Sequence, residues 1–177
     1  MEELVYDSVY LRREDFEERP DSTQEPVLFE TWDPNAQYAW DAGVAIGRYL
    51  QDLKAGRLIG RHCPECDRVL IPPRMFCESC FCATDHWVPL EDTGTVLTFS
   101  RCYVTWDMVY LEDPMMPAVI EIDGAAPGMG IMHLLGDVDP DALEIGMRVE
   151  AVWKPPTDRT GAITDIAYFR PLEPAEE

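Results

Sequence analysis

The sequence predicts an α+β fold that is mainly β, and three observations carry this prediction. Apolar residues recur at a helical spacing over residues 38–53. Two C-x-x-C pairs follow at residues 63–66 and 77–80, and five strand-like segments bounded by Gly, Pro or Asp occupy most of the remaining chain. The chain has 177 residues, of which 46% are hydrophobic, so it is long and apolar enough to bury a core.

A single amphipathic helix is predicted over residues 34–55. Asp33 and Pro34 supply an N-cap acid followed by proline at the first helical position. The apolar positions that share one helix face are Tyr38, Ala42, Ala45, Ile46, Tyr49, Leu50 and Leu53. Gly56 suits the position just after the helix, where the backbone often turns left-handed. Such a helix would either brace the structure or dock onto a partner.

The cysteines Cys63, Cys66, Cys77 and Cys80 form two C-x-x-C pairs separated by ten residues. This spacing brings four thiolates to one ion and is typical of a tetrahedral zinc site, with iron as the less favoured metal. The alternatives are two disulfides or unrelated buried thiols. Because sulfur would fill every coordination position, we expect a structural rather than a catalytic metal, in a rubredoxin-like zinc ribbon. Strands over residues 57–62, 69–71 and 86–88 would frame the pairs.

The second half of the chain predicts a small barrel. The five expected strands cover residues 95–104, 117–123, 130–135, 147–153 and 162–169. Residues 139–143 predict one helical turn between the third and fourth strands. This order fits a closed Greek-key barrel, the OB-fold. The predicted organisation is an acidic N-terminal extension over residues 1–33, helix plus ribbon over 34–90, barrel over 91–172 and an acidic tail over 173–177.

The net charge of −20, from 34 acidic and 14 basic residues, bears on the choice of partner. A chain this acidic would be repelled by phosphate backbones, so nucleic acid is disfavoured. A basic protein partner or simple solubility explains the charge better. No signal-peptide pattern and no apolar run near 18 residues is present, so we expect a cytoplasmic protein without a membrane span. The first 32 residues are either a disordered acidic tail or a segment that orders on a partner.

Several short motifs occur in a recognisable order over residues 37–170. They are L-K-A-G-R-L at 53–58, C-P-E-C at 63–66, P-P-R at 72–74, C-E-S-C at 77–80, D-T-G-T-V at 92–96, P-A-V-I-E-I-D at 117–123 and I-G-M-R-V at 145–149. In this order the chain resembles the acyl-CoA-associated zinc-ribbon/OB-fold family. The resemblance implies an accessory subunit of a thiolase-fold enzyme, such as a ketoacyl-CoA thiolase, a hydroxymethylglutaryl-CoA synthase or a steroid side-chain aldolase. The acidic extension is similar to that of the small subunits of benzoylsuccinyl-CoA thiolases.

Two features are candidates for contacts with a partner or with CoA. Arg74 follows two prolines beside the second cysteine pair, where it could hold a CoA phosphate or neutralise the metal site. Residues 105–116 predict a long loop that would either cap the barrel or bind a partner or a pantetheine chain. Its candidate contact residues are Trp106, Met108, Tyr110, Met115 and Met116.

The remaining chemistry-bearing residues indicate no catalytic site. Cys82 and Cys102 lack a local base, and His62, His86 and His133 are isolated in the sequence. Taken together with the family resemblance, this implies a zinc-binding, non-catalytic accessory subunit of a thiolase-type acyl-CoA acyltransferase complex, in aromatic or fatty acyl-CoA degradation. The thiolase-like partner would carry the catalysis and a CoA thioester would be its substrate. The alternatives are a single-stranded nucleic-acid or regulatory OB-fold module and a thiol enzyme acting through Cys102.

Overall fold

The computed structural model describes residues 17–18, 28–29, 37–39 and 41–172. The chain divides into two compact units, residues 1–40 and 41–177. In the first unit, strands β1 (Glu17–Glu18) and β2 (Leu28–Phe29) pair in antiparallel fashion. The predicted helix start at Asp33 and Pro34 and the acidic tail lie outside the described residues, as does most of the predicted extension.

The helix α1 spans Gly43–Lys54, so it begins later than predicted. The described residues 37–39 and 41–42 before it are not helical. Asp41 accepts a hydrogen bond from the Gly43 backbone N–H at 2.7 Å, and Gly43 has a φ of +70°, a conformation that cannot extend a right-handed helix backwards. The predicted end is confirmed. Gly56 has a φ of +74°, and the N–H groups of Gly56 and Arg57 bond back to the helix in a Schellman motif.

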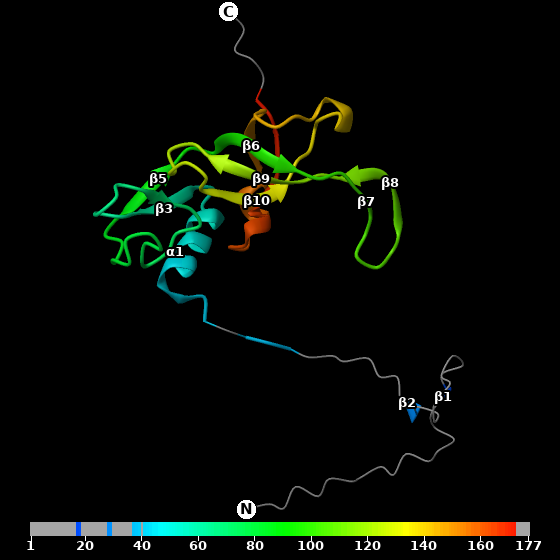
Figure 1. The fold of residues 1–177 in the computed structure, drawn as a ribbon, viewed down its shortest axis with the longest axis horizontal. Coiled ribbons are helices and arrows are strands. Elements are labelled where there is room, and N and C mark those ends of the chain that lie inside the picture. The colour runs from blue at the N-terminus through cyan, green and yellow to red at the C-terminus, as the bar shows by residue number, and fades with distance from the viewer. Residues whose placement is uncertain (1–16, 19–27, 30–36, 40, 173–177) are drawn as a thin grey trace, which may run out of the picture. The chain divides into compact units, whose positions relative to one another are not determined.

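The ribbon after the helix is a three-stranded antiparallel sheet in the order β4-β3-β5 (Figure 1). Its strands are β3 (Leu58–His62), β4 (Val69–Leu70) and β5 (Trp87–Leu90). They agree closely with the strands predicted around the cysteine pairs. Most of the chain between β3 and β5 forms two turns that carry these cysteines.

The barrel is a five-stranded antiparallel sheet in the order β10-β9-β6-β11-β12. Its strands are β6 (Thr93–Phe99), β9 (Pro117–Ile122), β10 (Gly130–Leu134), β11 (Arg148–Trp153) and β12 (Ile166–Pro171). A parallel bridge between Leu135 and Phe169 joins the two edges. The short 3-10 helix η2 (Pro140–Ala142) lies between β10 and β11, where the helical turn was predicted. Two further 3-10 turns are η3 (Pro156–Asp158) and η4 (Ile163–Asp165).

The strand predicted over residues 95–104 is wrong in one respect, because the structure divides it. After β6 ends at Phe99, β7 (Cys102–Val104) pairs with β8 (Tyr110–Met115) in a separate two-stranded hairpin. Arg101, at the break, donates to Asp141 at 2.8 Å. Part of the loop predicted over residues 105–116 is therefore strand. In Figure 1 this β7–β8 hairpin extends from the barrel on the side opposite β3 and β5.

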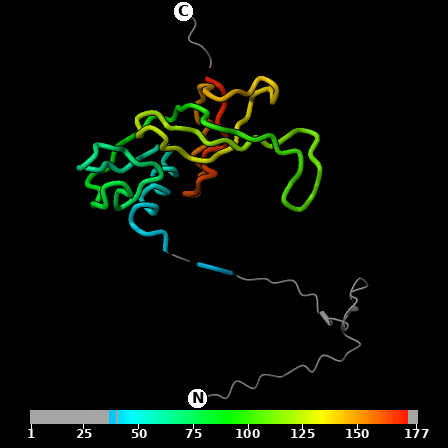
Figure 2. The backbone as a smooth tube through the Cα atoms, in the orientation of Figure 1, coloured from blue at the N-terminus to red at the C-terminus, as the bar shows by residue number. Residues whose placement is uncertain are grey.

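One hydrophobic core joins the helix, the ribbon and the barrel. Tyr49 and Leu53 of α1 and Leu58 of β3 belong to the same buried cluster as the barrel residues. The barrel members buried most completely are Val96, Ile120, Val149, Ile166 and Phe169. The smooth tube in Figure 2 shows the helix and the ribbon close beside the barrel. A change in the ribbon is therefore expected to reach the barrel through shared packing.

A buried carboxylate fixes the end of α1. Asp52 accepts hydrogen bonds from Arg48 at 2.6 Å and from the Arg57 Nε at 2.9 Å, and its side chain is almost fully buried. Burial alone would raise the pKa of Asp52, but the bonds from Arg57 and Arg48 outweigh it and hold the pKa below its usual range. The carboxylate thus ties the helix to the start of the ribbon.

We predict that Asp52→Asn lowers the free energy of unfolding at pH 7 by about 1–3 kcal/mol, since a charged hydrogen-bonded group is replaced by a neutral one. Because the pKa of Asp52 is lower in the folded than in the unfolded state, the ionised carboxylate contributes its full stabilisation above the ordinary aspartate pKa. This contribution is lost as the pH falls through the pKa of the folded state. The variant should therefore lose less stability on acidification than the wild type. Urea unfolding at several pH values measures this, with the exposed Asp158→Asn as control; equal acid sensitivity in wild type and Asp52→Asn would contradict it.

Candidate metal centre

The two cysteine pairs lie in turns of matching geometry. In the first, Cys63 N–H donates to the Arg68 carbonyl and Asp67 N–H donates to the Cys63 carbonyl, both at 2.9 Å. The second repeats this pattern with Cys77, Phe81 and Cys82, again at 2.9 Å. Asp67 and Phe81 occupy equivalent positions and both adopt positive φ, at 58° and 54°. This pairing of turns directs two sulfurs from each towards one point.

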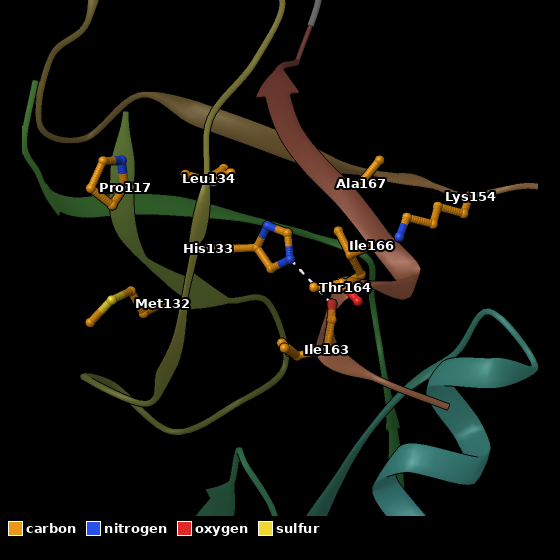
Figure 3. Close-up of a pocket in the computed structure, with 9 residues that line it drawn as sticks. All are labelled: Pro117, Met132, His133, Leu134, Lys154, Ile163, Thr164, Ile166 and Ala167. Carbon is orange, nitrogen blue, oxygen red and sulfur yellow. Dashed lines mark hydrogen bonds between the residues drawn. The ribbon is translucent and has the colours of Figure 1, made fainter. Parts of the chain in front are cut away.

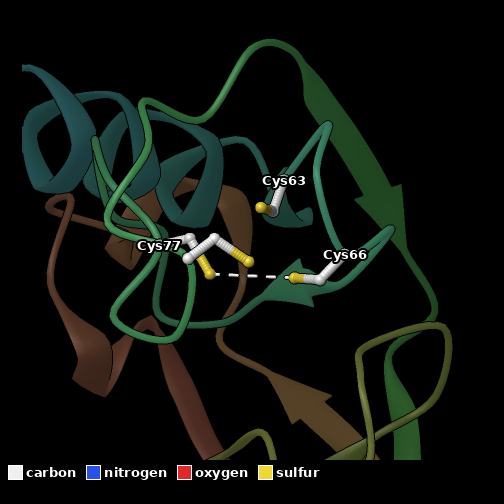
Figure 4. Close-up of side chains that lie close together, drawn as sticks. Cys63, Cys66 and Cys77 are labelled. Carbon is white, nitrogen blue, oxygen red and sulfur yellow. Dashed lines mark hydrogen bonds between the residues drawn. The ribbon is translucent and has the colours of Figure 1, made fainter.

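The four sulfurs of Cys63, Cys66, Cys77 and Cys80 lie within 4.8 Å of one another. Figure 4 shows the side chains of Cys63, Cys66 and Cys77 converging from the two turns. The sulfurs of Cys66 and Cys77 are 3.8 Å apart, whereas a disulfide would place them about 2 Å apart. Bonds of about 2.3 Å from a tetrahedral zinc to four sulfurs place those sulfurs about 3.8 Å apart. The geometry thus fits a Zn²⁺ ion, and all six cysteines of the chain are free.

The surroundings favour a thiolate at Cys63 but not at every member of the quartet, because the Cys66 thiol and burial raise the pKa of Cys80. Burial would raise the pKa of Cys63, but backbone N–H groups of Cys66 and Glu65 donate to its sulfur and lower the pKa to about 6. Cys63 is therefore mostly ionised at neutral pH before a metal binds. When bound, a Zn²⁺ ion would supply structural cross-linking, with Cys63, Cys66, Cys77 and Cys80 as its four ligands.

The guanidinium associated with the thiolates is that of Arg68, a residue that the sequence did not single out. Burial opposes its charge, but Glu78 and the sulfurs of Cys77 and Cys66 raise its pKa above the usual value. Arg68 donates to Glu78 at 3.1 Å and to Ser79 at 2.8 Å. Arg74 forms an ion pair with the same Glu78 at 3.0 Å. Arg74, the residue predicted to hold a phosphate or to neutralise the metal site, therefore lies near the second turn but is already paired with an acidic side chain.

The two cysteines outside the quartet differ in their surroundings. The Cys82 sulfur lies 3.5 Å from that of Cys63, and burial raises the pKa of its thiol. It is thus a neutral neighbour of the quartet. Cys102 is half-buried in β7, as expected for a residue within a strand.

Four of the five candidate contact residues of the β7–β8 region are exposed. Trp106 is the most exposed, at 96%, and Met108, Tyr110 and Met115 are also exposed to solvent. Met116 was grouped with them on sequence, but it follows the last residue of β8 and is only 9% exposed. It belongs to the core cluster, so it is not available to a partner.

An apolar pocket of about 410 Å³ lies where β10 and β12 meet beside η4 (Figure 3). Its lining residues are Pro117, Met132, His133, Leu134, Lys154, Ile163, Thr164, Ile166 and Ala167. His133 Nε2 donates to the Ile163 carbonyl at 3.2 Å, while its Nδ1 is buried without a hydrogen-bond partner. Lys154 is the only residue in this set that carries a permanent charge. Sequence reasoning missed the pocket because its walls come from strands far apart in the chain.

Within the described residues, no helix is long and apolar enough to cross a membrane. The expected cytoplasmic location stays a prediction.

We predict that Cys77→Ser removes the tightly bound zinc and lowers the melting temperature, because three sulfurs no longer close the tetrahedron. The protein is first passed over a weak chelating resin, and elemental analysis then gives the retained metal per chain. Cys102→Ser is the matched control and should retain one zinc and the wild-type melting temperature. Full zinc content in Cys77→Ser would show that the quartet is not the site; retained iron with visible absorbance would show a different metal.

Two family models match consecutive parts of the chain. The ChsH2 rubredoxin-like zinc ribbon domain matches residues 50–83, and the ChsH2 C-terminal OB-fold domain matches residues 87–154. Both confirm the predicted fold class, with a zinc ribbon followed by an OB-fold barrel. They also confirm the family resemblance carried by the ordered motifs.

Known proteins share this architecture. A DUF35 domain-containing scaffold protein of Methanocaldococcus jannaschii is 32% identical over 119 residues, which cover 66% of this chain and 82% of the relative. The structure of a DUF35 family protein of unknown function from Sulfolobus solfataricus matches with a TM-score of 0.51 and 21% identity, covering 59% of this chain and 75% of that one. A chain of the Ltp2-ChsH2(DUF35) aldolase matches with a TM-score of 0.51 and 23% identity, covering 70% and 91%. With both domains in order and the archaeal relative matched over most of its length, the chain belongs to the DUF35 family.

Proposed function

We propose that this chain is a zinc-binding, non-catalytic accessory subunit that assembles with a thiolase-type acyl-CoA enzyme. The observation that carries the proposal is the concentration of exposed apolar side chains on the β7–β8 hairpin. Two relatives support it. One is named a scaffold protein, and the other is part of an aldolase assembled from Ltp2 and a DUF35 chain.

The hairpin has the properties of a surface that another protein covers. A two-stranded hairpin is marginally stable in water without further packing. Trp106 and Tyr110 project large aromatic groups from it, and Met108 and Met115 add flexible apolar surface. Buried aromatic side chains of this kind contribute most of the binding energy in many interfaces. A partner would bury these side chains and stabilise the hairpin at the same time.

The quartet supports a structural role for the metal. Four sulfur ligands leave no position for a water molecule or a substrate, so the zinc would hold the ribbon rather than perform chemistry. Because α1, the ribbon and the barrel share one core, the zinc would also support the barrel from which the hairpin extends. Catalysis in the complex would then belong to the partner.

The apolar pocket is a candidate site for part of a CoA thioester. Its volume of about 410 Å³ and its apolar lining suit an acyl chain or a pantetheine arm. Lys154 would interact with a carbonyl or phosphate oxygen. Arg74 is less suited to a CoA phosphate because it is paired with Glu78. The acyl group would come from aromatic or fatty acyl-CoA degradation.

Ion pairing of the barrel arginines argues against the nucleic-acid alternative. Arg148 bonds to Asp123, Arg170 bonds to Glu150 and Arg101 bonds to Asp141. With a net charge of −20, few cations are left to neutralise a phosphate backbone. The same charge would instead favour a partner with a basic surface.

Co-expression with a thiolase-fold protein, sought among the products of the neighbouring genes, tests the proposal. We predict that an affinity tag on either protein retains the other, and that thiolysis by the complex falls when this chain is omitted. Separate elution of the two proteins, with thiolysis unchanged by omission, would contradict the proposal.

The double substitution Trp106→Ala and Tyr110→Ala should weaken binding to that partner at least tenfold, since buried aromatic anchors dominate such interfaces. The matched control is Ile145→Ala, which removes an exposed apolar side chain outside the hairpin and should leave the affinity unchanged. Calorimetry measures the affinities, and unchanged melting temperatures exclude misfolding. Equal loss of affinity in the control would place the interface elsewhere.

A further inference from the structure

A second cluster of metal-ligating side chains lies outside the thiolate quartet. His62, Asp85 and His86 each offer one donor atom, and these atoms lie within 4.8 Å of one another. Asp85 Oδ1 is 2.8 Å from the Nδ1 atoms of both His62 and His86. The two imidazole rings have centroids 4.4 Å apart. Two imidazoles and a carboxylate are a ligand set that borderline cations such as Zn²⁺ prefer.

The backbone holds this cluster in place at two strands of the ribbon, β3 and β5. His62 is the last residue of β3, and Asp85 and His86 immediately precede β5, which pairs with β3. His62 N–H donates to the His86 carbonyl at 3.0 Å, and Asp85 N–H donates to the His62 carbonyl at 3.1 Å. The His86 N–H also donates to Asp85 Oδ1 at 2.7 Å, which orients the carboxylate. The three donors are therefore brought together by the fold.

A fourth residue, Asp67, contacts the other nitrogen of the His62 ring. Its Oδ1 lies 2.8 Å from His62 Nε2. A carboxylate on the outer nitrogen of a metal-bound histidine fixes the tautomer and leaves the inner nitrogen free for the ion. Asp67 lies in the first cysteine turn with a positive φ, so the turn that carries Cys63 and Cys66 also positions this carboxylate. The arrangement has both the ligands and the outer support of a metal site.

Exposure suits the exchange of an ion with solvent. His62 is mostly covered, while Asp85 and His86 are exposed and can rotate. Tetrahedral bonds of about 2.0–2.2 Å place neighbouring N and O ligands roughly 3.3–3.6 Å apart. The present 2.8 Å contacts would need to open by less than about 1 Å. Small side-chain rotations of Asp85 and His86 provide this.

We propose that His62 Nδ1, an Asp85 carboxylate oxygen and His86 Nδ1 bind a second Zn²⁺ ion, with water in the fourth position. Asp67 acts as a positioning residue through His62. Three protein ligands with one open position distinguish this site from the closed quartet. The site would lie on the exposed face of the ribbon, where an ion can enter without unfolding the protein.

Calorimetric titration with Zn²⁺ tests the proposal. The full chain is first treated with a weak chelator so that only the quartet metal remains. The wild type should then bind one further ion, and His86→Ala and Asp85→Asn should each lose that ion while retaining the quartet zinc. Asp67→Asn, which tolerates the positive φ, should weaken the second site about tenfold to a hundredfold. His133→Ala alters the remaining histidine of the chain and should bind as the wild type does.

Weak Zn²⁺ binding by carboxylates scattered over the acidic surface is the competing explanation of a further bound ion, and the variants distinguish it from the proposed site. Weak binding to scattered carboxylates would persist in His86→Ala and would overturn the proposal, as would the absence of a further ion in the wild type. NMR of the histidine ring signals detects Zn²⁺ binding in the wild-type chain, without any substitution. Zn²⁺ should shift the ring signals of His62 and His86 and leave those of His133 unchanged. Unchanged signals for His62 and His86 would also overturn the proposal.

Discussion

The convergence of four thiolates from two matching turns is the constraint on which the rest of the structure depends. The ribbon has short strands, β4 consists of only two residues, and the buried members of the cluster at its turns are Cys63, Leu70 and Cys77. A closed tetrahedral ion would replace the missing core by cross-linking the two turns. Leu58 and Ile59 of β3 enter the same core as the barrel, so order in the ribbon is transmitted to β6, β9 and β11 by direct packing.

The parts of the molecule that remain exposed are then the parts available for function. The barrel is closed by its sheet and by the bridge between Leu135 and Phe169, and its core side chains are buried. The β7–β8 hairpin extends beyond this core with its aromatic residues exposed. The pocket beside β10 and β12 offers an apolar cavity with one lysine. The exposed apolar hairpin and the pocket are the two features that support the accessory role proposed above.

Sequence reasoning succeeded where the determining interactions are local. The spacing of Cys63, Cys66, Cys77 and Cys80 predicted the quartet, and Gly56 predicted the end of the helix, because each depends on neighbours a few residues away. Gly, Pro and Asp residues at the strand ends predicted the boundaries between most of the barrel strands. The predicted helix start was wrong because Asp41 and Gly43 determine where the helix begins. The sequence around them lacks the N-cap residue followed by proline that marks a strong helix start.

The remaining errors come from contacts between distant segments. Glu112, Asp113 and Pro114 lower the β propensity of β8, so only its pairing with β7 identifies it as a strand. The burial of Met116 follows from the position of the barrel core at the end of that strand. His62 and His86 are separated by the whole ribbon in sequence, and the pairing of β3 with β5 brings them together. No local pattern indicates these contacts.

Hydrogen–deuterium exchange of this chain alone and with the proposed thiolase-fold partner tests the central claim most directly, because it locates the covered surface without substitution. We predict that amides of residues 102–115 gain protection in the complex. Amides of β9 and β11, which are already bonded within the barrel, should change little. Unchanged exchange across residues 102–115, with protection confined to other parts of the chain or absent, would contradict the account.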